Sequence, residues 1–407
     1  MKTLAAVILV LAIAGCGTGS TPVSPSLAGA AAARTHSSSG FSVLYSFKGV
    51  NNGRDPHAGP LVKVKGTLYS TTEYGGGPCH DRCFGGTVFG ITTSGVETVL
   101  HSFETGSGDG KNPRAGVINV GSALYGVTVH GGTASCYCGA VFKVALSGAE
   151  TVLYSFTGKP DGFGPDAGLL DVNGTLYGTT INGGAHGDGT VFAVTLSGAE
   201  TVLHSFTGKP DGAHPYAGLT NVDGTLYGTT TTGGANDGGT VFTILPSGAE
   251  TILHSFQGGA ADGKFPTQAV LLDDNGTLYS TTKRGGTSDR GTVFSISPSG
   301  AVSVLHSFGG TEDGVYPYGG LLDVHGTLYG TTSNGGTGAC LRYGDVPGCG
   351  TVYKTTTSGA ETVLHDFDAL KDGRFPYAGL IDVKGRLYGT TTAGGVTNAG
   401  TVYSLSP

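Results

Sequence analysis

The sequence lacks the residues from which helical proteins are built. It has no tryptophan, a single methionine among 407 residues, and only 13% Asp, Glu, Lys and Arg together, against about 25% in an average soluble protein. No stretch after residue 40 places apolar residues at the i, i+3, i+4, i+7 spacing of an amphipathic helix. These absences argue against a helical fold and favour an almost purely β protein.

Positive charge is also scarce. The 22 Lys and Arg residues are outnumbered by 29 Asp and Glu residues, the net charge is −7, and no run of basic residues occurs. Binding to a phosphate backbone requires a basic patch or stripe. Nucleic acid is therefore excluded as an expected partner.

The first residues have the pattern of an export signal. The stretch MKTLAAVILVLAIAGC has one lysine, an apolar run over 4–14 that is too short to span a membrane, and small residues before Cys16. Its last four letters, IAGC, are similar to a bacterial lipobox, in which the signal is cut before a cysteine that is then lipidated. An ordinary signal peptide with an incidental cysteine is the alternative.

Residues 16–40 follow as a Gly, Ser, Thr, Pro and Ala stretch without apolar periodicity, which is typical of a flexible linker. The expected organisation is a signal peptide at 1–15, a lipidated Cys16 with its linker at 16–40, and a folded domain at 41–407. We expect an exported protein held by its lipid in the bacterial cell envelope, where it faces the periplasm or the exterior.

From residue 41 onward the chain is a tandem repeat that is rich in glycine, with 76 Gly residues in all. Three phrases recur seven times each in fixed order, and they read LYG, GTVF and VLHSF with small variations. The VLHSF copies begin at Val43, Val99, Val152, Val202, Ile252, Val304 and Val363. Repeats of this length indicate a solenoid or a propeller.

Each repeat contains four short β patterns, which in the fourth copy read PYAGLTNV, GTLYGTT, GTVFTIL and AETILHSF. Asp223-Gly224 separates the first two patterns and Ser247-Gly248 the last two; such pairs favour tight hairpin turns. The repeat therefore predicts a four-stranded antiparallel meander. Seven of them without intervening helices predict an all-β, seven-bladed β-propeller.

The two ends of the repeat region are offset in a complementary way. The phrase FSVLYSF at 41–47 precedes every other repeat element, and GTVYSLSP at 400–407 has no VLHSF phrase after it. In a ring, the first strand pairs with the last blade and completes it, which removes the open sheet edges. A β-solenoid is the alternative, but it would leave an incomplete unit at each end. A monomer is expected.

The phrases DGxxPYAGL, GTLYGTT, GGTVF and AETVLHSF resemble those of the GloVer tandem-repeat family over the whole of 41–407. This is a group of exported bacterial proteins that share the repeat and differ in their anchors. The resemblance implies the repeat architecture and a location at the cell envelope, but no reaction.

The variable positions of the repeat lie in the loops that follow the fourth strand. The residue after the loop proline and the residue before it vary among the copies while their neighbours stay nearly constant, and seven copies would place these residues around the mouth of a central funnel. Aromatic faces flanked by polar groups suit sugar rings or a peptide. The candidate ligand-binding residues are His57, Arg114, Asp166, His214, Tyr216, Phe265, Tyr316, Tyr318, Phe375 and Tyr377.

Three functions are compatible with these residues. The first is a non-catalytic binding module for a glycan or another polymer. The second is a propeller-type polysaccharide lyase or hydrolase that uses Asp55, His57, Arg114, Asp166 and His214, although these groups form no compact catalytic motif. The third is a protein–protein scaffold or adhesion module. In the alternative to all three, the aromatic residues only pack between blades.

Two further sets recur with the repeat. The histidines of the fourth strand (His101, His204, His254, His306 and His365) are replaced by tyrosine in two copies, so we expect a packed, hydrogen-bonded role rather than catalysis. The Asp-Gly pairs of the loops are expected to make turns. No cofactor or metal is predicted; calcium is the one ion considered, because each loop offers a carboxylate.

Six cysteines follow Cys16, and they form three local pairs, which are Cys79 with Cys83, Cys136 with Cys138, and Cys340 with Cys349. In an exported protein we expect disulfides that close long loops. Cross-pairing between the first two pairs, and a zinc site formed by their four thiols, are the alternatives.

Overall fold

The computed structural model describes residues 40–57, 59–77, 85–103, 108–267, 271–310, 312–340 and 346–407. The chain divides into two units, Met1–His36 and Ser37–Pro407. The first unit lies outside the described residues, and with it the predicted signal peptide and lipidation site at Cys16. Within the described part, no helix is long and apolar enough to cross a membrane.

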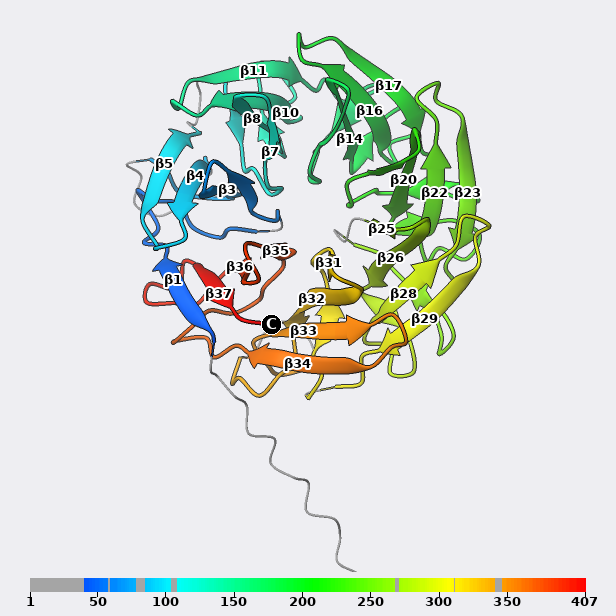
Figure 1. Cartoon of the computed structure of the whole chain (residues 1–407). Helices are drawn as coiled ribbons and strands as arrows, with labels where there is room; N and C mark the ends of the chain where they lie inside the picture. The colour runs from blue at the N-terminus through cyan, green and yellow to red at the C-terminus, as the bar shows by residue number, and fades with distance from the viewer. Residues whose placement is uncertain are drawn as a thin grey trace, which may run out of the picture. The chain divides into compact units, whose positions relative to one another are not determined.

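The unit Ser37–Pro407 is a seven-bladed β-propeller, as predicted (Figure 1). Each blade is an antiparallel sheet whose four strands run in order from the axis outward. The first three blades contain β2 (Val62–Val64), β3 (Thr67–Thr72), β4 (Thr87–Thr92) and β5 (Glu97–Ser102); β7 (Ile118–Val120), β8 (Ala123–Thr128), β10 (Ala140–Ala145) and β11 (Glu150–Ser155); and β13 (Leu170–Val172), β14 (Thr175–Thr180), β16 (Thr190–Thr195) and β17 (Glu200–Ser205).

The remaining blades repeat this order. They contain β19 (Thr220–Val222), β20 (Thr225–Thr230), β22 (Thr240–Ile244) and β23 (Glu250–Ser255); β25 (Leu272–Asp274), β26 (Thr277–Thr282), β28 (Thr292–Ile296) and β29 (Val302–Ser307); β31 (Leu322–Val324), β32 (Thr327–Asn334), β33 (Thr351–Thr356) and β34 (Glu361–Asp366); and β35 (Ile381–Asp382), β36 (Leu387–Thr391), β37 (Thr401–Leu405) and β1 (Ser42–Ser46).

The seventh blade closes the ring with strands from both ends of the domain. β1 pairs antiparallel with β37, with Val43 opposite Tyr403, and the two strands lie side by side in Figure 1. Arg386 strengthens this seam, since its Nη2 donates to the carbonyl oxygen of Gly40 over 2.8 Å. The predicted closure is therefore confirmed, and the solenoid alternative is wrong.

Aromatic side chains fill the spaces between neighbouring blades. The phenylalanine that ends each VLHSF phrase packs edge-on against the aromatic residue of the GTVF phrase in the next blade, as Phe206 does against Phe242, with 5.1 Å between ring centroids. Both rings are fully buried. The same contact recurs between every pair of adjacent blades, including the closing contact of Phe47 with Phe89. The core is thus a ring of equivalent aromatic pairs.

The glycine that opens each GTVF phrase allows close contact between blades. Gly400 has φ +96°, and a Cβ atom there would lie 2.6 Å from Cδ of Pro56 in the loop of the next blade. A side chain would therefore require both a strained backbone and a displaced proline. This contact explains why glycine and the loop proline recur together.

The loops on one side of the ring contain short ladders that the sequence did not reveal. Four of them are two-stranded, and in the sixth blade β30 (Val315–Pro317) joins β32. The two-stranded ladders are β6 (Gly110–Lys111) with β9 (His130–Gly131), β12 (Gly162–Phe163) with β15 (Asn182–Gly183), β18 (Gly212–Ala213) with β21 (Thr232–Gly233), and β24 (Gly263–Lys264) with β27 (Arg284–Gly285). They hold the funnel-side loops in fixed positions.

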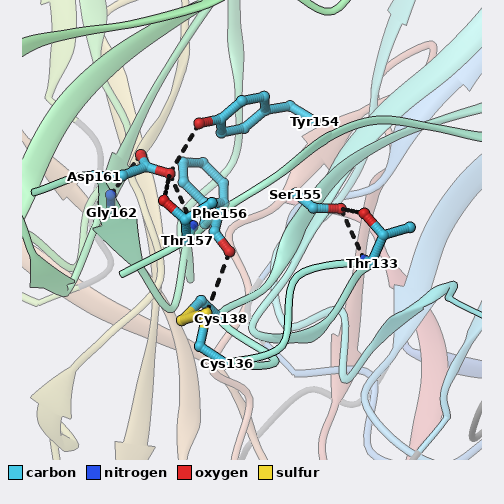
Figure 2. Close-up of a disulfide and its surroundings, with 9 residues drawn as sticks. All are labelled: Thr133, Cys136, Cys138, Tyr154, Ser155, Phe156, Thr157, Asp161 and Gly162. Atoms are coloured by element: carbon cyan, nitrogen blue, oxygen red, sulfur yellow. Dashed lines mark hydrogen bonds between the residues drawn. A yellow bond between two sulfur atoms is a disulfide. The ribbon is translucent and has the colours of Figure 1, made fainter. Parts of the chain in front are cut away.

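Two of the predicted disulfides are present. Cys136 pairs with Cys138 and Cys340 with Cys349, each within a loop between the second and third strands of its blade. Figure 2 shows the first of them beside the outer strand of the second blade, where Cys136 Sγ lies 3.4 Å from the carbonyl oxygen of Phe156. Cross-pairing and a four-thiol zinc site are therefore wrong for Cys136 and Cys138. The pair Cys79 and Cys83 lies outside the described residues.

Candidate functional site

One cavity of about 670 Å³ receives a residue from every blade. All seven residues that follow the loop prolines line it, together with five neighbours. The lining residues are His57, Arg114, Asp166, Tyr216, Thr231, Thr232, Phe265, Thr267, Lys283, Arg284, Tyr318 and Tyr377. Seven of the ten residues predicted from the sequence are among them. The loop position that varies between copies therefore faces one shared space.

The backbone beside each lining residue is held in an unusual conformation. The residue before the loop proline has positive φ in all seven copies, for example 55° at His214 and 58° at Phe265. A bulky side chain rarely adopts this region, and strain of this kind concentrates at functional sites. Here the conformation turns the chain so that the residue after the proline faces the cavity.

Hydrogen bonds to two sides stabilise this turn. The amide of His214 donates to the carbonyl of Asp188 in the preceding blade over 2.8 Å, and its own carbonyl accepts from the amide of Thr231 over 3.1 Å. Phe265 makes the equivalent bonds to Gly238 and Lys283. Each link ties one blade to the next directly beside the cavity, so the lining residues are placed by the rigid part of the fold.

One wall of the cavity carries charge. Arg114 Nε donates to Oε1 of Glu73 over 2.8 Å, and its Nη1 lies 3.7 Å from Oδ2 of Asp166. Both carboxylates are nearly inaccessible to solvent, while a third of Arg114 remains exposed. Burial alone would lower the pKa of Arg114, but Asp166 and Glu73 together raise it. The guanidinium is therefore a fixed cation between two buried anions.

The opposite wall is aromatic. Tyr318 packs edge-on against Tyr377 with 4.8 Å between ring centroids, and His57 stacks on the other side of Tyr377 at 5.2 Å. Lys283 Nζ lies 5.2 Å from the centroid of Tyr318. Tyr377 is only 8% exposed, so it packs between blades as the alternative interpretation proposed, whereas Tyr216 and Tyr318 keep partly exposed faces.

Thr267 adds an unused hydrogen-bonding group to the lining. Its Oγ1 is shielded from solvent and has no hydrogen-bond partner within the described ranges. A buried hydroxyl without a partner costs free energy unless something else bonds to it. The cavity thus combines aromatic faces, fixed charge and a free hydroxyl.

Three predicted residues lie away from the cavity lining. His214, Tyr316 and Phe375 precede the loop proline and share the positive φ of Phe265, but unlike Phe265 they do not line the cavity. His214 Nδ1 lies 3.0 Å from the carbonyl oxygen of Ile181, Tyr316 lies beneath the guanidinium of Arg284, and Phe375 is buried in the core. They support the loops rather than line the site.

A second variable position was missed. Thr231, Thr232, Lys283 and Arg284 line the cavity, and Glu73 holds Arg114 at its edge. All five occupy the one or two positions directly after the threonine pair of the second strand. The signal was present, because this position also varies among the copies, reading Glu73, Val129, Ile181, Thr231, Lys283, Ser333 and Thr392. A comparison of the copies at this phrase would have found it.

The outer-strand histidines and the loop Asp-Gly pairs meet away from the cavity. In the second blade, where tyrosine replaces histidine, Tyr154 Oη donates to Oδ2 of Asp161 over 2.9 Å (Figure 2). Asp161 also accepts from the amides of Thr157 and Gly162. The hydrogen bonding expected of the outer-strand residues is confirmed, and their pairing with the loop aspartates is new.

Comparisons with known proteins agree with the repeat. The profile of the Gloeobacter/Verrucomicrobia repeat matches residues 26–208 and 133–343. The sequence matches none of the curated proteins.

Solved structures similar to the chain include a gluconolactonase from Xanthomonas campestris (15% identity, TM-score 0.40, 66% of this chain and 79% of that one). A putative TolB from Agrobacterium tumefaciens has 10% identity and a TM-score of 0.40 over 66% and 83% of the two chains. A luciferin-regenerating enzyme has 14% identity and a TM-score of 0.41 over 70% and 88%.

These structural similarities are too weak to carry an argument about function. The repeat profile, in contrast, extends over more than half of the chain, and the phrases that it matches build the blades described above. The protein belongs to the Gloeobacter/Verrucomicrobia repeat family.

Proposed function

We propose that this protein is a non-catalytic binding module of the bacterial cell envelope and that it takes a saccharide-containing polymer in the cavity. The observation that carries the proposal is the arrangement of the seven variable loop residues, which all line one cavity of about 670 Å³. The scaffold around them is repetitive, so variation at this one place favours recognition over packing.

The chemistry of the two walls suits a sugar. Partly exposed tyrosine rings such as Tyr216 and Tyr318 offer flat apolar faces to the C–H face of a pyranose. Arg114, Asp166 and the Thr267 hydroxyl offer donors and acceptors to its hydroxyl groups. Pockets of about 300 to 1,000 Å³ with an apolar lining and a few polar groups are typical ligand sites.

The test is a screen of soluble polysaccharides and glycans against the purified protein. We expect at least one polymer to bind, and we expect Tyr216→Ala combined with Tyr318→Ala to weaken its binding at least tenfold. Tyr377 is left unchanged because it is nearly buried. The matched control is Tyr137→Ala, an exposed tyrosine outside the cavity lining, which should leave affinity unchanged.

The same samples separate binding from catalysis. A lyase or hydrolase would shorten the bound polymer, so its chain length is followed by size-exclusion chromatography after prolonged incubation. We expect no change. Shortening of the polymer would overturn the non-catalytic part of the proposal, and equal affinity of the double variant and the parent would overturn the site.

The location is part of the proposal and rests on the sequence. The export signal and lipobox-like IAGC predict a lipid on Cys16, and two disulfides support an oxidising compartment. We expect Cys16→Ala to move the protein from the membrane fraction to the soluble fraction of the cell envelope. Retention of the variant in membranes would contradict a lipid anchor.

A further inference from the structure

Between some blades, a glutamate reaches the His–Asp pair of the preceding blade. Glu150, the first residue of β11, approaches His101 of β5 and Asp109 of the loop after it. His101 Nε2 lies 3.0 Å from Asp109 Oδ2, and one ligand atom from each of the three residues lies within 4.8 Å of the other two. A donor set of one imidazole and two carboxylates results.

The same geometry recurs two blades further on. His204 Nε2 lies 3.1 Å from Asp211 Oδ2. Glu250, the first residue of β23, is the third member of this group, and one ligand atom from each residue again lies within 4.8 Å of the other two. Equivalent positions of the repeat supply all three residues. The arrangement is therefore built by the fold at two separate places.

At two other interfaces, different residues surround the glutamate. Between the seventh and first blades, Tyr45 Oη and Asn52 Nδ2 both donate to Oε2 of Glu97, over 3.1 and 2.9 Å. Between the second and third blades, where the glutamate is Glu200, Tyr154 takes the place of the histidine, and its phenol donates to Asp161. A neutral phenol therefore takes the place of the histidine at both of these interfaces.

Two other interfaces show that the His–Asp pair does not need the glutamate. Val302 replaces it beside His254, whose Nε2 stays 3.2 Å from Asp262. Phe41 replaces it in the seventh blade and stacks on His365, which remains 2.8 Å from Asp372. The glutamate is thus an addition to a pair that forms on its own.

At Glu150 and Glu250, no neutral side chain takes the place of Tyr45 or Asn52. The partners are a second carboxylate and an imidazole. Oε1 of both glutamates is shielded from solvent and has no hydrogen-bond partner in the described part of the chain, and the same is true of Glu97 and Glu200, so the two groups differ from those interfaces in their histidine and not in this atom. In each group the glutamate faces a second carboxylate and an imidazole, and a cation between them would balance the two negative charges.

We propose that His101, Asp109 and Glu150, and likewise His204, Asp211 and Glu250, bind a divalent transition metal of the zinc type. Zn²⁺ binds imidazole nitrogen and carboxylate oxygen at about 2.0 to 2.2 Å, and sites with three protein ligands leave a position for water. The histidines are 18% and 21% exposed, so an ion can enter from solvent. Each ion would join two adjacent blades.

The interface between the fifth and sixth blades has the same residue types, but we do not propose a metal site there. Glu361 accompanies His306 and Asp313 there, and the Nε2–Oδ2 distance is longer, at 3.4 Å. It serves as a comparison within the same molecule.

The test is titration of the chelator-treated protein with ZnCl₂, with bound zinc measured by equilibrium dialysis. We expect Glu150→Val and Glu250→Val each to remove one equivalent of bound zinc, and the double variant to remove two. Valine is chosen because Val302 shows that the repeat folds with it. His101→Tyr, which copies the Tyr154 interface, should remove the same equivalent as Glu150→Val.

A gain of binding provides the complementary test. Val302→Glu should create a third site with His254 and Asp262, so it should add one equivalent. Thermal unfolding without zinc confirms that each variant is folded, and added zinc should raise the melting temperature of the parent but not of the Glu150→Val, Glu250→Val double variant. Zinc binding that is absent from the parent, or that is equal in the parent and the double variant, would overturn the proposal. In that case a shared proton, not a metal, balances these carboxylates.

Discussion

The contacts between blades and the wall of the cavity use the repeat in opposite ways. Between blades, each copy supplies the same kind of aromatic residue, so Phe206 meets Phe242 as Phe156 meets Phe192, at 5.1 and 5.0 Å. At the cavity, equivalent backbone positions supply five different residue types from seven copies. Constancy maintains the ring, and variation at one place makes a surface with its own chemistry.

The aromatic side chains of these two regions also differ in how far they are buried. The aromatic residues between blades are fully buried and touch only other parts of the protein. Tyr216 and Tyr318 keep part of their faces exposed although their neighbours are buried. Substitutions in the two regions should therefore affect different quantities, stability in the first and ligand affinity in the second.

The largest effect is expected from opening the ring. Deletion of residues 41–47 removes β1 and leaves β37 with an unpaired edge, and it also removes Phe47 from its contact with Phe89. An exposed strand edge promotes association of chains. We expect loss of the soluble monomer, measured by size-exclusion chromatography, whereas a chain that lacks only residues 1–36 should remain monomeric. A monomeric, cooperatively unfolding deletion variant would show that the seam is dispensable.

The next effect distinguishes the two regions directly. Phe206→Ala leaves a cavity between the third and fourth blades, and truncation of a buried phenylalanine costs about 3–5 kcal/mol. Tyr216→Ala should change the free energy of unfolding by about 1 kcal/mol or less, because its ring is partly exposed. Urea denaturation of both variants measures this difference. Equal losses would mean that Tyr216 is a core residue rather than part of a binding surface.

The sequence predicted the features that depend on periodicity. Strand order, the count of blades and the pairing of FSVLYSF with GTVYSLSP follow from repeated phrases and their offset ends. The lining of the cavity by His57, Arg114 and Asp166 followed from comparing one position among copies.

Other features depend on conformations that leave no mark in the sequence. A residue before proline is normally extended, so nothing indicated that this residue would adopt positive φ in all seven copies, or that Phe265 would line the cavity while Tyr316 and Phe375 would not. The approach of Glu150 to His101 depends on the stagger between two blades, and residue spacing alone does not determine that stagger.

A smaller effect on stability is expected from a change of pH, which acts on Glu200 at the interface between the second and third blades. Burial, and then the nearby Asp161, raise the pKa of Glu200 to about 7, while a hydrogen bond with Tyr154 opposes the rise. The folded protein therefore holds this proton more tightly than the unfolded chain. Stability from this group is full below the ordinary pKa of 4.5 and falls as the pH rises towards about 7.

The comparison is with Glu200→Gln, which mimics the protonated side chain and does not titrate. The free energy of unfolding of the parent should fall by about 1 kcal/mol more than that of the variant between pH 5 and pH 8, a figure reduced because the group is half exposed to solvent. Identical pH profiles would show that Glu200 is not perturbed by folding.

The smallest effect concerns one copy that departs from the constant part of the repeat. In the third blade, Oγ1 atoms of Thr180 and Thr190 lie 2.8 Å apart, and the same bond recurs in five other blades. In the second blade Ala140 stands opposite Thr128, whose buried hydroxyl has no hydrogen-bond partner among the described residues. Ala140→Thr should restore the bond and raise the free energy of unfolding by about 0.5–1.5 kcal/mol.

Thr190→Ala is the matched control, because it recreates the second-blade arrangement in the third blade and should lower stability by a similar amount. Urea denaturation measures the stability of both variants, and the comparison holds if the dependence of the unfolding free energy on urea concentration is unchanged. If Ala140→Thr instead lowers stability, the second blade lacks room for the hydroxyl that six other copies accommodate. The second blade would then be the one copy that cannot form this threonine pair. The loop that joins its two strands, β8 and β10, contains the disulfide of Cys136 and Cys138.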